Sequence, residues 1–318
     1  MSAVHLRGAL FAAVLIGAAF VSNLAPSAAA LDCSAARNNP IPLENVNGLV
    51  LVNALADGAA LRLILDTGAE RTILTSSAAE RIGGKAPPVQ FQRQLKGVAA
   101  AVQGRDIEFK SLTIGGIDIP WRRAMVAPTP LPPALLGADG FLGTDVLGKF
   151  DIDLDLPHQR MWLYERGTCV PNWTDTRAKI DIGRSAINGH MFFPVQLDRR
   201  KVVATIDTGA DRTTLSIAAA HAMGLTDAVL ARDRPGITKG FGGGQLTSRI
   251  HRFASLAVGN ITLSDPEIVV TDLRLRGIDL ILGMDFLRSR RLFLSYANFR
   301  LFLSTSSAAT ASKTAAAR

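Results

Sequence analysis

The first half of the chain begins with a pattern of apolar runs and tight turns that predicts a β-hairpin. Residues 48–56 are mostly apolar and end at Asp57-Gly58, a pair that strongly favours a two-residue hairpin turn. Residues 60–65 then return as a second apolar run, and Asp66 follows directly. We therefore expect Asp66 at the end of a buried strand.

The same pattern recurs in the second half. Residues 191–197 and 202–206 flank a turn at 198–200, and the second run ends at Asp207. Each half also has an Ala-rich stretch that predicts a brief helix, at 76–82 and 216–223. Each half closes with a predicted hairpin, at 150–164 and 291–303. Short strands with closely spaced turns predict a mainly β fold of two small barrel-like lobes.

The two halves are copies of one module. Asp66 and Asp207 lie 141 positions apart (207 minus 66), and both open the sequence Asp-Thr-Gly-Ala. Four landmarks recur in the same order: Asp-Thr-Gly-Ala at 66–69 and 207–210, Lys-Gly at 96–97 and 239–240, Ser-Leu-x-x-Gly at 111–115 and 255–259, and Leu-Gly-x-Asp at 142–145 and 282–285.

Composition fits two ordinary globular domains and argues against a nucleic-acid partner. The chain has 318 residues, of which 48% are hydrophobic and 19% charged, enough apolar material for two cores. The net charge of +8 comes from scattered Lys and Arg, without an aromatic-rich basic element that would stack bases. A weak attraction to anionic lipid headgroups stays open.

The N-terminus predicts export. His5 and Arg7 precede an apolar stretch at 8–21. Small residues then lead to Ala28-Ala29-Ala30, which fits a signal-peptidase site. Because a membrane span needs roughly 20 residues, we expect a cleaved signal peptide at 1–30 and no stable membrane span afterwards. The expected location is the periplasm, with an uncleaved membrane anchor as the alternative. The expected lobes are 31–170 and 171–304, and a disordered tail is expected at 305–318.

Cysteine and histidine usage gives no sign of a metal site. Cys33 and Cys169 are the two cysteines, and in an oxidising compartment they are expected to form one disulfide, with two unpaired thiols as the alternative. The histidines at 158, 190, 221 and 251 lack metal or triad spacing and are expected on the surface or in turns. We expect neither a metal nor a cofactor.

The paired aspartates are the chemically informative feature. One Asp-Thr-Gly alone is weak evidence, because Asp and Gly are common in turns. A duplicated module, however, commonly packs about a pseudo-twofold axis, where Asp66 and Asp207 would meet. Two adjacent carboxyl groups do not both ionise, so one becomes a general acid and the other a general base. The hydroxyls of Thr67 and Thr208 can reach the opposite backbone.

The motifs resemble those of the retropepsin family, the aspartic proteases of retroviruses and their bacterial relatives. The resemblance rests on Asp-Thr-Gly-Ala, on the Thr and Leu that follow it, and on the late apolar-apolar-Gly, and it covers about residues 45–303. It implies Asp66 and Asp207 as the catalytic pair, peptide bonds as substrate, and two closed β-barrel lobes related by a pseudo-twofold axis. The implied loop support consists of Thr67, Gly68, Ala69, Thr208, Gly209 and Ala210.

Two departures from that family change the expectations. Arg71 and Arg212, which follow the loops, are expected to pair with Asp145 and Asp285. The alanines at 69 and 210 replace hydroxyl residues found in pepsin-like enzymes, so fewer hydrogen bonds reach the carboxyl groups. A mildly acidic pH optimum is therefore expected.

Glycine-rich segments resemble the flaps that close over substrate in this family. In the second half the flap residues are Gly240, Phe241 and Gly242, and in the first half they are Gly97 and Val98. An ordinary flexible hairpin remains the alternative for each segment.

Two functions from different classes remain at this point. The first is an exported aspartic endopeptidase, and the second is a non-catalytic peptide-binding protein that retains the protease cleft. A binding protein needs neither aspartate, whereas both copies keep Asp-Thr-Gly-Ala. We expect a monomer in which the lobes pair within one chain, and pairing between chains is the alternative.

Overall fold

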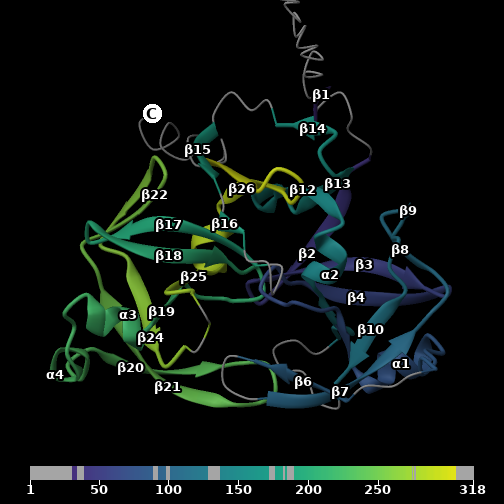
Figure 1. Ribbon diagram of the computed structural model, residues 1–318, viewed down its shortest axis with the longest axis horizontal. Coiled ribbons are helices and arrows are strands. Elements are labelled where there is room, and N and C mark those ends of the chain that lie inside the picture. Colours follow the sequence, from purple (N-terminus) through teal and green to yellow (C-terminus); the bar gives the residue numbers. More distant parts are fainter. Residues whose placement is uncertain are drawn as a thin grey trace, which may run out of the picture.

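The structure is a computed structural model with two β-sheet lobes side by side (Figure 1). It describes residues 31–33, 39–88, 92–97, 101–127, 137–171, 176–181, 183–184, 190–273, 275 and 277–305. The expected signal segment 1–30, Val98 and residues 306–318 lie outside the described residues. Among the described residues, no helix has the length and apolar character to cross a membrane.

The first lobe is built almost entirely from short strands. Its elements are β2 (Ile41–Val46), β3 (Leu49–Ala56), β4 (Ala59–Leu65), β5 (Ile73–Leu74), α1 (Ser76–Arg81), β6 (Gln92–Lys96), β7 (Ala101–Glu108), β8 (Leu112–Ile114), β9 (Ile117–Asp118), β10 (Arg123–Val126), β11 (Gly140–Leu142), α2 (Thr144–Leu147), β12 (Phe150–Asp155), the 3-10 turn η2 (Leu156–His158) and β13 (Arg160–Glu165). Two short strands, β1 (Leu31–Asp32) and β14 (Cys169–Val170), flank it.

The second lobe repeats this order. Its elements are β15 (Thr176–Asp181), β16 (Gly183–Arg184), β17 (Met191–Leu197), β18 (Arg200–Ile206), β19 (Thr214–Ser216), α3 (Ile217–Ala222), α4 (Asp227–Leu230), β20 (Arg234–Lys239), β21 (Gln245–Arg252), β22 (Ser255–Val258), β23 (Ile261–Ser264), β24 (Glu267–Thr271), β25 (Leu280–Leu282), α5 (Met284–Leu287), β26 (Arg290–Ser295) and β27 (Arg300–Thr305). The mainly β class expected from the sequence is confirmed.

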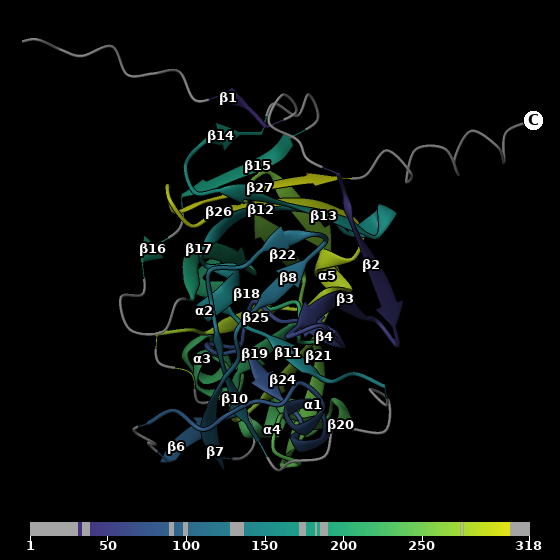
Figure 2. The same cartoon turned by 90° about the vertical axis from the view of Figure 1, so that its right-hand side faces the viewer.

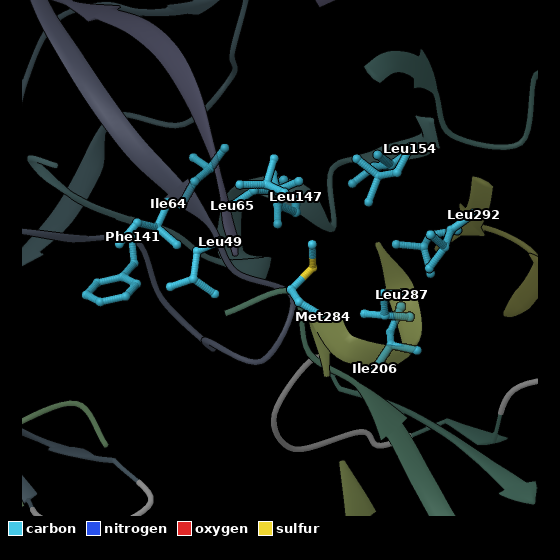
Figure 3. Packing of buried hydrophobic residues seen from close by; sticks show 14 of the residues in the cluster. Leu49, Ile64, Leu65, Phe141, Leu147, Leu154, Ile206, Met284, Leu287 and Leu292 are labelled. Carbon is cyan, nitrogen blue, oxygen red and sulfur yellow. The ribbon is translucent and has the colours of Figure 1, made fainter. Parts of the chain in front are cut away.

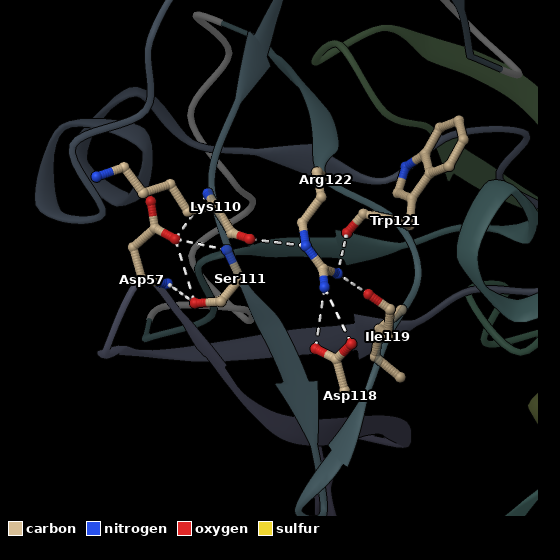
Figure 4. Close-up of polar contacts among 7 residues, drawn as sticks. All are labelled: Asp57, Lys110, Ser111, Asp118, Ile119, Trp121 and Arg122. Atoms are coloured by element: carbon tan, nitrogen blue, oxygen red, sulfur yellow. Dashed lines mark hydrogen bonds and ion pairs between the residues drawn. The ribbon is translucent and has the colours of Figure 1, made fainter.

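An aspartate in the β3–β4 turn, and its counterpart in the β17–β18 turn, tie these hairpins to later strands. Asp57 has a φ of 47°, the left-handed value that a type I′ turn needs. Its carboxylate accepts hydrogen bonds from the amides of Lys110 and Ser111, both at 2.7 Å (Figure 4). In the second lobe Asp198 accepts from the amide of Ser255 at 2.9 Å. The predicted turn therefore also fixes a contact that is distant in sequence.

Both lobes cross strands in the same way beside their aspartate. Strand β11 runs parallel to β4 and antiparallel to β5, and β25 bears the same relation to β18 and β19. The amide of Asp66 consequently donates to Leu142 O at 3.1 Å, and that of Asp207 donates to Leu282 O at 3.0 Å. The late Leu-Gly motif of each half thus lies next to the Asp-Thr-Gly loop.

A central sheet joins the lobes within one chain. Hairpins β12–β13 and β26–β27 pair through β12 and β26, in antiparallel register from Asp151 opposite Ser295 to Asp155 opposite Arg291. This sheet lies at one end of the molecule, and the hairpins β6–β7 and β20–β21 lie at the other (Figures 1 and 2). The strand order of each sheet is an open path, so the closed barrels stay a prediction. Strand β27 extends to Thr305, one residue past the expected lobe boundary.

One apolar cluster underlies both lobes and the central sheet. Figure 3 shows side chains from β4, β11 and α2 of the first lobe together with side chains from β18 and α5 of the second lobe. Ile64 and Leu65, which precede Asp66, are fully buried, and Ile206, which precedes Asp207, is 3% exposed. Burial of such side chains contributes about 1.5–3 kcal/mol each, so both aspartates follow strands held firmly in the core.

A disulfide fastens the N-terminal segment over the central sheet. Cys33 and Cys169 are bonded, and β1 pairs in parallel with β14. The two cysteines share a small buried cluster with aromatic side chains of β13, β26 and β27, namely Trp162, Tyr164, Phe293 and Phe302. The bonded cysteines therefore belong to a second, smaller core on the central sheet.

Candidate active site

Two threonines lock the Asp-Thr-Gly loops to each other across the lobe boundary. The amide of Thr67 donates to Thr208 Oγ1 and the amide of Thr208 donates to Thr67 Oγ1, each at 3.1 Å. The hydroxyls in turn donate to the opposite strand, Thr67 to Ile206 O at 3.1 Å and Thr208 to Leu65 O at 2.6 Å. Both side chains are buried. The reach across to the opposite backbone that the sequence suggested is present, and it is reciprocal.

The glycine of each loop makes room for the aspartate of the other. A Cβ at Gly68 would lie 2.3 Å from Asp207 Cγ, and a Cβ at Gly209 would lie 2.5 Å from Asp66 Cγ. Real Cβ atoms do not approach other atoms so closely. The two carboxyl groups therefore meet between the loops, each against the backbone of the opposite lobe.

Backbone amides hold both carboxyl groups in place. Asp66 Oδ1 accepts from the amides of Gly68 at 2.9 Å and Ala69 at 2.8 Å. Asp207 Oδ1 accepts from the amide of Gly209 at 2.8 Å. These amides favour the ionised form of a carboxyl group. The backbone amides that donate to the two carboxyl groups are therefore similar in the two lobes but not identical.

Protonation differs between the two aspartates. Both retain partial exposure, yet burial raises the pKa of Asp66 well above its ordinary value, and the charge of Asp207 raises it further. Burial also raises the pKa of Asp207, while hydrogen bonds from the Gly209 amide and the Asp66 side chain oppose this. Both shifts favour the protonated form, so the coupled pair keeps one proton to a higher pH than an isolated carboxyl group would. One proton donor and one proton acceptor lie side by side.

Each loop is anchored from behind by a threonine and a late aspartate. In the first lobe Asp145 Oδ1 accepts from the amide and the hydroxyl of Thr72, both at 2.8 Å. In the second lobe Asp285 Oδ1 accepts from the amide of Thr213 at 2.8 Å and its hydroxyl at 2.6 Å. Thr72 and Thr213 entered the sequence analysis only as part of the motif that resembles the retropepsin family, and no contact with the late aspartates was predicted for them. The signal was available, because each threonine follows its Asp-Thr-Gly aspartate by the same number of residues.

The arginines expected to pair with these late aspartates do so unequally. Arg212 Nε lies 3.5 Å from Asp285 Oδ2. Arg71 has a weaker effect on Asp145. Burial raises the pKa of Asp145, and the charge of Arg71 lowers it less than the hydrogen bonds from Thr72 and Val146 do. Hydrogen bonding to threonine, rather than an ion pair, is thus the contact that both lobes share.

The second-lobe hairpin that was expected to be a flap contacts the first lobe. Hairpin β20–β21 closes with a hydrogen bond from the Gly240 amide to Gly244 O at 3.2 Å. The ring of Phe241 at its tip lies edge-on to Phe141, with ring centroids 5.7 Å apart. Phe141 is opposite Ile64 in the β11–β4 pairing, and Ile64 lies two residues before Asp66. Gly97 is described just after β6, whereas Val98 lies outside the described residues.

Acidic, His and Cys side chains do not gather into a possible metal site anywhere in the described part of the chain. One expectation about the histidines is wrong. His190 and His251 were expected on the surface or in turns, but their side chains are only 9% and 16% exposed. His251 accepts or donates a hydrogen bond at 2.7 Å to Asp233.

Comparisons with known proteins show the family and the fold of the chain. The UBA domain-containing protein Mud1 of Schizosaccharomyces pombe (strain 972 / ATCC 24843) is 32% identical over 114 residues, a match that covers 33% of this chain and 33% of that protein. The chain therefore spans about a third of the length of this relative. The crystal structure of aspartic proteinase from Irpex lacteus has a TM-score of 0.53 and 15% identity, covering 85% of this chain and 97% of that one.

A second similar structure is basic 7S globulin from soybean, with a TM-score of 0.48, 14% identity, and coverage of 85% of this chain and 95% of that one. The likeness to the Irpex proteinase shows the fold. A family model described as aspartyl protease matches residues 52–146 and 193–286, which is more than half of the chain and one region in each lobe. The chain belongs to the aspartyl protease family and carries two retropepsin-like lobes.

Proposed function

We propose that this protein is an aspartic endopeptidase that hydrolyses peptide bonds with Asp66 and Asp207 as its catalytic pair. The observation that carries the proposal is the placement of each carboxyl group against the glycine of the opposite loop. With one proton on the pair, the ionised Asp207 accepts a proton from an attacking water. As the water oxygen bonds to the carbonyl carbon, Asp66 donates its proton to the carbonyl oxygen, which gives a gem-diol. Asp207 then passes the proton it took from water to the leaving nitrogen as the C–N bond breaks, and Asp66 regains a proton from a diol hydroxyl. The chemistry needs no covalent intermediate.

The surroundings support this division of roles. The threonine cross-links prevent the two loops from separating, and the buried strands behind them keep the local dielectric low. Preorganised groups of this kind spend little free energy on reorganisation during the reaction. The Phe241 flap then covers the region beside Asp66, where an extended peptide would bind. The raised pKa of Asp66 supports a mildly acidic optimum, because the rate falls once the pair loses its proton.

Export and an intrachain pair are part of the same proposal. The Cys33–Cys169 disulfide supports an oxidising compartment such as the periplasm. The β12–β26 pairing supports a monomer in which both aspartates come from one chain. N-terminal sequencing of the exported protein tests the expected signal cleavage after residue 30, and sedimentation tests the monomer.

A peptide-library digest tests the activity. The protein without residues 1–30 is compared with Asp66→Asn and Asp207→Asn between pH 3 and pH 8, and products are identified by mass spectrometry. Loss of cleavage by at least about 1,000-fold in both variants is expected, since each removes one half of the acid–base pair. Full activity in either variant contradicts the proposal. Peptide binding without cleavage by the wild type favours the non-catalytic alternative.

A further inference from the structure

His190 lies buried at the boundary between the lobes, next to the first active-site loop. It directly precedes β17 in the second lobe, and its side chain is 9% exposed. Its Nε2 is 3.9 Å from Oε1 of Glu70 in the first lobe. Its Nδ1 is buried and has no hydrogen-bond partner. A buried polar atom without a partner is costly, so this imidazole is not explained by the packing of the strand that follows it.

Glu70 connects this histidine to the catalytic loop. It follows Ala69, whose amide donates to Asp66 Oδ1 at 2.8 Å. A force on the Glu70 side chain therefore acts one residue away from a hydrogen bond that holds the Asp66 carboxyl group. The Glu70 side chain is 53% exposed, which leaves it free to move toward the imidazole.

The other half of the molecule lacks this pair. At the position 141 residues earlier than His190 stands Leu49, which is 8% exposed and part of the apolar core. The counterpart of Glu70 is Asp211, which is exposed. The duplicated lobes thus differ beside their active-site loops, and the ionisable pair of His190 and Glu70 lies beside the Asp66 loop.

The 3.9 Å approach of Glu70 Oε1 to His190 Nε2 places two titratable groups in contact. Burial lowers the pKa of His190 and raises the pKa of Glu70, while the neighbouring Arg71 lowers the pKa of Glu70. Glu70 is the charged group within 4 Å of the His190 imidazole among the ion pairs of the described residues, and Arg71 adjoins Glu70 in the chain. At neutral pH the imidazole is uncharged and the carboxylate is ionised. On acidification the two groups together take up one proton and attract each other.

We propose that His190 is a positioning residue for the Asp66 loop: a proton taken up at mildly acidic pH draws His190 and Glu70 together and fixes the loop against the second lobe. The proposal rests on the proposed peptidase function for its kinetic consequence, but the contact itself exists independently of catalysis. Because the two lobes of this chain differ, the contact acts on the Asp66 loop alone. In a pair of identical lobes the same contact would be present at both loops.

A titration followed by NMR tests the contact without any substrate. The His C2–H resonance of His190, assigned by its absence in His190→Gln, is followed between pH 4 and pH 8 in the wild type and in Glu70→Gln. Loss of the carboxylate should move the His190 midpoint down by about 0.5 or more on the pH scale. An unchanged midpoint overturns the proposal.

Kinetics test the positioning role. His190→Gln and His190→Leu, the residue found at the matching position 49, should lower kcat at mildly acidic pH by about 3–10-fold with KM little changed, since a misplaced catalytic group reduces the rate. His221→Gln, at an exposed histidine bonded to Asp227, is the matched control. Profiles of kcat against pH that superimpose on the wild type overturn the proposal, with melting curves confirming that each variant is folded. If neither the wild type nor any variant cleaves peptides, the proposed peptidase function is wrong, and the NMR titration still decides whether the pair exists.

Discussion

The backbone of Gly68 lies directly against the carboxyl group of Asp207, at a spacing that leaves no room for a Cβ atom. Each active-site loop is therefore shaped by the side chain that the other loop contributes. A single added methyl group tests this relationship.

Gly68→Ala should reduce kcat/KM by about 100-fold or more. Its Cβ would lie 2.3 Å from Asp207 Cγ, so the Asp207 carboxyl group would have to move by about 1 Å. Gly209→Ala should do the same through Asp66, where the spacing is 2.5 Å. Both effects are measured on a peptide found by library digestion, with far-UV circular dichroism to confirm folding. Wild-type rates in folded Gly68→Ala would show that the carboxyl groups do not meet as described.

Thr208→Val should destabilise the protein by about 2–4 kcal/mol. The change leaves Leu65 O and the amide of Thr67 without partners in the protein, at about 1–3 kcal/mol for each buried group. Urea unfolding measures the effect. Thr205→Val is the control, because the buried Thr205 Oγ1 has no hydrogen-bond partner and its removal should be neutral or stabilising. Equal losses in both variants would argue against a special role for the cross-link.

Asp66→Asn should raise the melting temperature at pH 7 by a few degrees and leave it nearly unchanged at pH 3. The folded carboxyl group has a raised pKa, so between the unfolded value of about 3.9 and the folded value the folded state binds more protons. The free energy of unfolding of the wild type therefore falls as pH rises through that interval. The variant, which cannot ionise, avoids this loss. Asp211→Asn, at an exposed carboxyl group past the second loop, should show no such gain.

Phe241→Ala should raise KM for peptides by about 5–10-fold with a smaller effect on kcat. It removes the contact with Phe141, which is of the kind that contributes about 0.5–1.5 kcal/mol beyond its buried area. Ile237→Ala is the control, since this residue of the same hairpin is 65% exposed. If KM changes equally in both variants, general flap flexibility rather than the aromatic contact explains the result.

Much of this arrangement could be predicted because short-range rules and duplication acted together. The Asp57-Gly58 turn and the apolar run after it place Asp66 within one residue of its observed position after β4. The equivalence of the halves then predicted that Thr67 and Thr208 lie close together. The sequence pattern of one half alone does not predict this contact.

Other features depend on tertiary contacts and could not be predicted in this way. Helices α2 and α5 have only four residues, too short for a periodic pattern, and their first turns are held by the carboxylates of Asp145 and Asp285. The burial of His190 was missed because its partner lies in the opposite lobe. The unequal arginine pairing was missed because identical sequence positions acquire different neighbours once the halves pack together.

The antiparallel pairing of β12 with β26 also determines how the protein responds to dilution. In an enzyme assembled from two separate chains, each chain supplies one aspartate, and at low concentration the chains part and the rate per molecule falls. Here the two hairpins that join the halves belong to one polypeptide, so their encounter is intramolecular and independent of the number of molecules present. For the proposed monomer, the rate per molecule should therefore stay constant on dilution.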